Sequence, residues 1–258
     1  MKKYLFLICS FMFLMNVNAE NGTCGTNLTW ILSNGTLTIN GSGSMNNYSV
    51  LTTFNLPPWY SSRTTITKII VNDNVTSIGN FAFASCSKLT SVVVGNQVSK
   101  LGNNSFAACT LLNSIDLNNV REIGTTAFYN CTSLANVDFG NSINYISASA
   151  FNLCNIKTIN LPASFCNFIG DAFNDCQSLE KINIDDTNQQ YCSIDGIVYN
   201  KDLSSLIMCP PAVSSLTIPG TVKSIHGTAF YNCSKLSTLN LPNTINTIEH
   251  YTFYSCTN

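Results

Sequence analysis

The sequence predicts a repeat solenoid, in which short units stack along one axis, preceded by a small all-β cap. A Phe-x-x-Cys pair recurs along the chain with steps of 23, 22, 23, 22, 57 and 23 residues. Before each pair lies the spacing Leu-x-x-Leu-x-Leu, in which Ile or Val can replace Leu. A fixed period in the twenties with this spacing is the signature of a leucine-rich repeat solenoid. The phenylalanines of the pairs are Phe83, Phe106, Phe128, Phe151, Phe173, Phe230 and Phe253.

A single repeat buries too few apolar side chains to offset the entropy lost when its backbone is ordered. Stacking covers these side chains and pairs the backbone of each leucine-rich segment with its neighbours. We therefore expect one parallel β-strand per repeat and one continuous ladder, with Ile115, Val137 and Ile159 side by side. The segment around each Phe lacks strand alternation, and we expect a short helical or 3₁₀ turn there with the ring in the core.

Residues 1–19 are predicted to be a cleaved signal peptide. They contain two lysines, an apolar run over residues 4–15 and a small-residue cleavage site at residues 17–19. An uncleaved membrane anchor is the alternative, which the short run disfavours because a span needs ~20 apolar residues. No later run approaches this length. We expect a protein that is secreted or held at the extracellular face of the cell surface, with no transmembrane span in the mature chain.

Residues 20–65 are predicted to form the N-terminal β cap. Two short strands, at residues 28–32 and 36–39, flank Asn34-Gly35, which is a strong hairpin signal. Without a lid, the first repeat would expose its apolar core face. Trp30 and Trp59 are suited to cover it. A binding site built on these two tryptophans is the alternative.

Residues 66–258 are predicted to form the leucine-rich repeat solenoid, with a hairpin insert near residues 185–212. The sixth repeat lacks its Phe-x-x-Cys pair after Ile184, and two strand-like runs, at residues 194–199 and 206–209, follow instead. The insert is either a tolerated interruption or a specificity loop beside the open face.

Strand alternation places the residue between the last two apolar positions of each repeat on the outer face. Several of these residues are polar, and their regular spacing suits an extracellular protein or glycan as ligand. Solvated side chains without a partner are the alternative. The candidates for the ligand face are Asp116, Asp138, Asn160, Asn183 and Asn240.

Composition excludes some classes of function. With a net charge of −1 and 10% charged residues, the chain offers no basic surface, so no nucleic acid partner is expected. Seven of the twelve cysteines occupy the repeat slot, where we expect buried apolar fillers, with disulfides as the alternative. Cys192 and Cys209 flank the predicted hairpin and form the candidate pair. No Cys-x-x-Cys motif occurs and both histidines are isolated, so we expect neither a metal nor a cofactor.

No catalytic constellation is recognisable. His226 and His250 lie one register apart in successive repeats without a catalytic motif around them, and no phosphate-binding glycine-rich loop occurs. We therefore expect that the protein is not an enzyme. Nine Asn-x-Ser/Thr sequons are candidates for N-glycosylation. They are Asn21, Asn27, Asn34, Asn40, Asn47, Asn74, Asn103, Asn130 and Asn232.

The repeat sequence resembles that of the BspA-like leucine-rich repeat family, whose members are exported surface proteins of microbes. Residues 75–86 are close to its typical repeat, and residues 24–30 with 34–39, and residues 195–202, look like its hallmark segments. Departures are Phe165 and Phe168 where Val and Ile are usual, and Ser105 and Thr252 in place of Ala. The resemblance covers essentially all of the mature chain. It implies attachment to host matrix proteins, host cells or other microbes.

We therefore expect an adhesin that engages host matrix or cell-surface proteins, or other microbial cells, through the solenoid face. The alternative is a structural, self-assembling surface-coat protein without a specific host ligand. Only two residues follow Cys256. The last core face would then be uncapped. Either the chain is shortened relative to a longer relative, or it covers this face by self-association through the C-terminal end.

Overall fold

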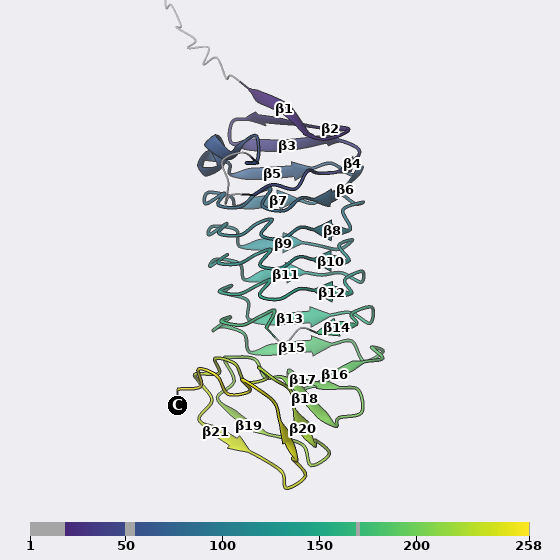
Figure 1. The fold of residues 1–258 in the computed structure, drawn as a ribbon, viewed down its shortest axis with the longest axis vertical. Coiled ribbons are helices and arrows are strands. Elements are labelled where there is room, and N and C mark those ends of the chain that lie inside the picture. Colours follow the sequence, from purple (N-terminus) through teal and green to yellow (C-terminus); the bar gives the residue numbers. More distant parts are fainter. Residues whose placement is uncertain (1–18, 50–54, 169–170, 258) are drawn as a thin grey trace, which may run out of the picture.

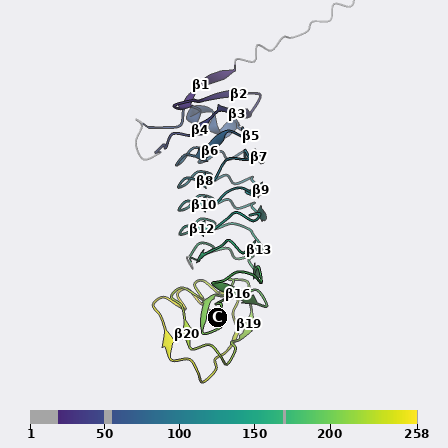
Figure 2. The same ribbon diagram turned by 90° about the vertical axis from the view of Figure 1, so that its right-hand side faces the viewer.

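The computed structural model describes residues 19–49, 55–168 and 171–257. Within these ranges the chain winds into a stack of coils, elongated along one axis (Figures 1 and 2). The predicted solenoid is therefore confirmed. The predicted signal peptide, apart from its last residue, lies outside the described residues.

The leucine-rich segments form a first column of short parallel strands. Adjacent strands are in register, so that Ile115 lies opposite Val137 and Ile159 lies opposite Ile182. Their apolar side chains point into the core and the alternating polar ones point outward. The strands are β5 (Lys68–Val71), β7 (Ser91–Val93), β9 (Ser114–Asp116), β11 (Asn136–Asp138), β13 (Thr158–Leu161), β15 (Lys181–Ile184), β19 (Ser215–Thr217) and β21 (Thr238–Asn240).

This column is not the continuous ladder that the sequence predicts. Strand β7 is not hydrogen-bonded to β9, and β11 is not hydrogen-bonded to β13. Val137 and Ile159 therefore belong to separate sheets. At this break Phe139 occupies the buried slot that Leu117 fills one coil earlier, and its ring packs edge-on against Phe151 at 5.7 Å. An aromatic ring needs more room between coils than a leucine does.

A second strand column corrects the expectation of one strand per repeat. Apart from the coil that the insert interrupts, each coil contributes a further short strand at its Val-x-x-Ile segment, and up to the insert these strands form one unbroken parallel sheet that begins at β4. The strands are β4 (Gly43–Ser44), β6 (Val75–Ile78), β8 (Lys100–Leu101), β10 (Glu122–Ile123), β12 (Tyr145–Ile146) and β14 (Asn167–Phe168), followed later by β20 (Ser224–Ile225) and β22 (Thr247–Ile248).

The third side of each coil is the segment that ends in Phe-x-x-Cys, and we call the stack of these segments the turn column. The expected helical or 3₁₀ turn is a chain of hydrogen-bonded turns instead. Phe81 and Ser85 adopt φ of 55° and 61°, which a helix does not tolerate. Cys86 N–H donates to the Phe83 carbonyl at 3.3 Å, whereas Phe83 N–H donates across to Ser105 in the next coil at 2.8 Å.

The phenylalanines of the turn column form a stack through the core. Phe106, Phe128 and Phe151 lie parallel, with centroid separations of 5.3 and 5.0 Å. The cysteines support this stack, because five of the seven thiols, those of Cys109, Cys131, Cys154, Cys176 and Cys256, donate to the phenylalanine carbonyl of the preceding coil. Cys131 Sγ, for example, lies 3.2 Å from the Phe106 carbonyl oxygen. Every cysteine among the described residues is unpaired, including Cys192 and Cys209.

The solenoid begins on a three-stranded antiparallel sheet. It consists of β1 (Glu20–Gly25), β2 (Leu28–Ser33) and β3 (Thr36–Gly41), and β3 then pairs in parallel with β5. The 3₁₀ helix η1 (Tyr60–Thr65) follows. Trp59 is buried, stacks on Phe83 at 5.7 Å and donates Nε1–H to the Ala82 carbonyl at 2.8 Å. Trp30 packs edge-on against Trp59 at 5.6 Å. Both tryptophans are therefore used in packing against the first coil.

The insert repeats this arrangement in the middle of the chain. Strands β16 (Tyr191–Ile194), β17 (Ile197–Asn200) and β18 (Ser205–Met208) are antiparallel, and β18 then pairs in parallel with β20. Val198 and Met208 join the core of the preceding coils, whereas Tyr199 and Leu206 join the core of the following ones. The insert thus separates two hydrophobic cores and contributes side chains to both. The exact boundaries of the cap and of the insert stay predictions.

Candidate binding face

All five predicted ligand-face residues are exposed on the first strand column. Asp116 ends β9, Asp138 ends β11, Asn160 lies on β13, Asn183 on β15 and Asn240 ends β21. Strand alternation explains this placement, because the residues on either side of each one are directed into the coil.

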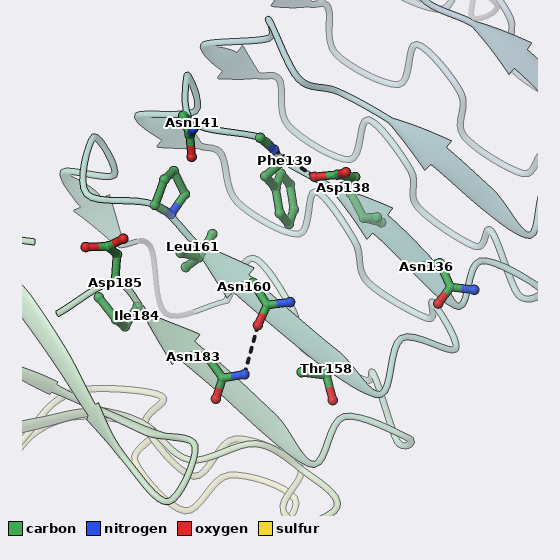
Figure 3. Close-up of a pocket in the computed structure, with 13 residues that line it drawn as sticks. Asn136, Asp138, Phe139, Asn141, Thr158, Asn160, Leu161, Asn183, Ile184 and Asp185 are labelled. Carbon is green, nitrogen blue, oxygen red and sulfur yellow. Dashed lines mark hydrogen bonds between the residues drawn. The ribbon is translucent and has the colours of Figure 1, made fainter. Parts of the chain in front are cut away.

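Three of the five residues meet at the break in the first column. A groove of about 680 Å³ lies between β11 and β13, and Asp138, Asn160 and Asn183 line it. Figure 3 shows these side chains on three neighbouring strands, with Asn183 Nδ2–H donating to Asn160 Oδ1 at 2.8 Å. Strands β11 and β13 each have one hydrogen-bonded neighbour in this column, so each has an edge without a strand partner at the groove.

The carboxylates at the groove are oriented by the turns that follow their strands. Asp138 Oδ1 accepts a hydrogen bond from Gly140 N–H at 3.0 Å. Asp185 accepts bonds from the hydroxyl and the backbone N–H of Thr187, which lower the pKa of its carboxyl. The second oxygen of Asp138 has no partner in the parts of the chain that the structure describes. The groove thus presents fixed acceptors to solvent, and none of its lining residues is basic.

Four polar residues of the groove were not among the sequence candidates, namely Asn136, Asn141, Thr158 and Asp185. Asn136 and Thr158 stand two positions before Asp138 and Asn160, so the same alternation places them on the outer face. Asp185 is the acceptor of an Asp-x-Thr turn directly after a strand, a pattern that sequence inspection can recognise.

The two remaining candidates do not line this groove. Asp116 lies opposite Asp138 on the paired strand β9, and both line a recess of about 340 Å³. Asp116 also lines a smaller groove of about 240 Å³ at the break between β7 and β9, where Val93 is exposed. Its Oδ1 accepts from Asn118 N–H at 3.0 Å, as in the turn after β11. Asn240 lies beyond the insert, where its Nδ2 donates to Thr217 Oγ1 at 3.0 Å. The insert therefore separates Asn240 from the other four.

The sequons differ in exposure. Asn40, Asn130 and Asn232 are half-buried, and Asn232 Nδ2 is already bonded to Asp175. The other six are exposed, and glycosylation at any of them stays a prediction. The exposed members are Asn21, Asn27, Asn34, Asn47, Asn74 and Asn103.

The histidines do not form part of a recognisable catalytic group. His226 Nε2 lies 4.0 Å from Glu249 Oε2 across two coils, and both side chains are about half exposed. Among the described residues no group of three or more His, Cys, Asp or Glu is placed to hold a metal ion. That the chain is not an enzyme stays a prediction. Within the same residues, no helix combines the length and the apolar character needed to cross a membrane.

The solved structures that resemble this one are leucine-rich repeat proteins of bacteria. One from Eubacterium ventriosum is 25% identical, with a TM-score of 0.71, and the match covers 92% of this chain and 63% of that one. The pneumococcal vaccine antigen PcpA is 19% identical with a TM-score of 0.69, covering 92% and 68%. A leucine-rich cell surface protein from Faecalibacterium prausnitzii is 20% identical with a TM-score of 0.56, covering 92% and 80%.

The chain therefore spans less than two thirds of the first of these proteins. No curated protein matches the sequence. The profile of the BspA type leucine rich repeat region matches residues 58–180 and 208–258, in six copies. Since these ranges make up more than half of the sequence, the chain belongs to the BspA-type leucine-rich repeat family.

Proposed function

We propose that this chain is a binding protein of the extracellular cell surface, an adhesin that engages host matrix or cell-surface proteins, or other microbial cells, through its strand face. The groove between β11 and β13 carries the proposal. There Asp138, Asn160 and Asn183 present hydrogen-bonding groups from three coils on a surface that the core does not need. Family membership and the predicted signal peptide support the location.

The chemistry of the groove favours, as ligand, a protein segment rich in hydrogen-bond donors. Asp138 and Asp185 supply carboxylate oxygens, and charge-assisted hydrogen bonds from Arg or Lys are about twice as strong as neutral ones. The unpartnered edges of β11 and β13 supply backbone groups that an extended segment pairs with. A basic, extended segment of an extracellular protein is the partner that combines both features.

The test compares two sets of alanine substitutions on the strand face. Asp138, Asn160 and Asn183 are replaced together, and the control variant carries Thr217→Ala and Asn240→Ala on β19 and β21. Surface plasmon resonance against immobilised matrix proteins and flow cytometry with whole cells measure the binding. We expect at least a tenfold loss for the groove variant and none for the control. Equal binding by all three proteins places the site elsewhere, and no binding by the unmodified chain refutes adhesion.

The alternative, a self-assembling coat protein, rests on the last coils. Leu241, Ile248 and Phe253 expose 47%, 49% and 38% of their surface, which is unusual for the apolar positions of a repeat. Self-association through these side chains stays a prediction. Light scattering over a micromolar concentration series tests it, since a monomer throughout contradicts assembly.

A further inference from the structure

A second recess lies on the turn column, where the insert interrupts the solenoid. It has a volume of about 410 Å³, within the range of ~300 to 1,000 Å³ that small-molecule sites occupy. Asn152, Asp171 and Asn174 line it from the coils before the insert. Tyr231, Tyr251 and Tyr254 line it from the coils after the insert, so neither core forms the recess alone.

The recess exists because the two parts of the turn column are joined differently here. Elsewhere backbone N–H groups such as that of Phe83 donate directly to the next coil. At the junction, side chains form the link: Asn232 donates to Asp175, and Ser234 Oγ–H donates to Gln177 Oε1 at 3.2 Å. These residues are 57 positions apart in the sequence.

The later side of the recess is aromatic and open to solvent. The rings of Tyr231 and Tyr254 stack at 5.2 Å, and Tyr251 meets Tyr254 edge-on at 6.0 Å. Tyr251 and Tyr254 expose 69% and 52% of their surface. Clustered exposed rings carry a solvation cost that a ligand with an apolar face removes.

The earlier side is polar and under-satisfied. Asn152 Oδ1 and Asp171 Oδ1 are buried acceptors without a hydrogen-bond partner among the described residues. Asn174 is 94% buried, since only 6% of its surface is exposed. A buried acceptor without a partner destabilises the protein, and a donor brought by a ligand removes that cost. Burial also raises the pKa of the Asp171 carboxyl.

We propose that this recess is a carbohydrate-binding site that holds one sugar residue of a glycan between the tyrosines and the Asn152, Asp171 and Asn174 wall. A pyranose ring has C–H groups on one face, which pack on the negative face of an aromatic ring. Its hydroxyls are donors and acceptors, which match a carboxylate and two amides. The site is on a different side of the coil from the groove, so it is independent of the adhesin proposal.

A cationic ligand fits the arrangement less well. Aromatic cages for quaternary ammonium groups direct several ring faces at one point. Here Tyr231 and Tyr254 stack on each other, which occupies one face of each ring. The Asn152 and Asn174 amides also carry N–H donors. A sugar hydroxyl can accept from these donors, whereas an ammonium group has no acceptor to offer them.

The experiment screens the unmodified protein on an array of neutral and acidic glycans. Saturation-transfer NMR with the strongest disaccharide then compares it with Tyr254→Ala, Asp171→Asn and the control Tyr129→Ala. Tyr129 is an exposed tyrosine of the turn column that does not line the recess. Circular dichroism and thermal melts establish that each variant is folded.

We expect the disaccharide to receive saturation through protons of one ring face. Its affinity should fall at least tenfold in Tyr254→Ala and in Asp171→Asn, and remain unchanged in Tyr129→Ala and in the triple variant of the groove. Absence of glycan binding overturns the proposal, as does equal binding by a folded Tyr254→Ala variant. Choline binding that Asp171→Asn abolishes would also overturn it, since the recess would then be a cation site.

Discussion

The turn column and the first strand column join the same coils in different ways. In the turn column, backbone bonds such as that from Phe83 to Ser105, stacked rings and buried thiols link one coil to the next. The first strand column breaks twice before the insert, at β7/β9 and at β11/β13, and again at the insert, between β15 and β19. The second strand column is unbroken from β4 to β14, so cohesion between these coils is weakest along the first strand column. That column is the side left free to vary, and the candidate binding groove lies there.

Raising the pH should give the largest loss of stability, through the turn column. Burial raises the pKa of the Cys86, Cys131 and Cys176 thiols from 9.0 to about 12, and that of Cys109 and Cys154 well above 9.0. The unfolded chain therefore loses these protons first. Their contribution is fully present below pH 9 and is lost as the pH rises toward 12.

At pH 10 the ionisation of each such thiol in the unfolded chain lowers the free energy of unfolding by about 1 kcal/mol, and the five thiols together lower it by several kcal/mol. Urea unfolding at a series of pH values measures this loss. Lysines and tyrosines also titrate in this range, so Cys131→Ala is the matched control. Between pH 9 and 11 the free energy of unfolding of Cys131→Ala should fall less steeply than that of the unmodified protein. The difference in slope should correspond to one fewer proton released on unfolding. Identical slopes would mean that the Cys131 thiol ionises in the folded protein.

Removing one ring of the phenylalanine stack should have the next largest effect. Phe128 is fully buried between Phe106 and Phe151, and we expect Phe128→Ala to cost about 3–5 kcal/mol because the coils cannot close the cavity. Tyr129→Ala, at an exposed neighbouring position, should cost less than ~1 kcal/mol. Denaturant unfolding measures both. Equal losses of unfolding free energy in the two variants would show that the phenylalanine stack stabilises the protein no more than an exposed side chain does.

Alanine substitutions on the strand face should have the smallest effect on stability. Asp116→Ala, Asp138→Ala and Asn160→Ala remove exposed side chains, and each should change the free energy of unfolding by less than ~1 kcal/mol. Thermal melts of the single variants provide the measurement. A loss above ~2 kcal/mol for Asp138→Ala would mean that its bond to Gly140 holds the coil together, which would remove the contrast between the two sides.

The sequence predicts the solenoid well because its anchors are regular and nearly all buried. Ile115 and Phe128 recur at fixed positions in each repeat, and burial at each turn leaves little choice of residue. The second strand column escaped prediction because strands of two residues, such as Lys100–Leu101, are too short to show alternation. The sequence predicts helical turns in place of the observed ones because residues such as Ser85 adopt a left-handed backbone conformation without being glycine. No glycine therefore marks these positions in the sequence.

The candidate sites depend on contacts that periodicity does not encode. Alternation alone exposes Asp138 and Asn160, but the groove between them requires the break beside Phe139. The tyrosine recess brings Asn174 and Tyr231 together across the insert, whose path sequence analysis did not predict.

The side-chain link at the insert also has a mechanical consequence. Tension along the long axis passes through the turn column from coil to coil and pulls on the backbone hydrogen bonds that join successive coils. At the junction the turn column is joined instead by the side chains of Asn232, Ser234 and Lys235, which bond Asp175 and Gln177, although Ala212 N–H still donates to the Leu179 carbonyl nearby at 2.9 Å. Side-chain bonds at a partly solvated surface rupture more readily than a backbone ladder. Under load, the contacts between the coils before and after the insert should break first, and the two sets of coils should then extend independently.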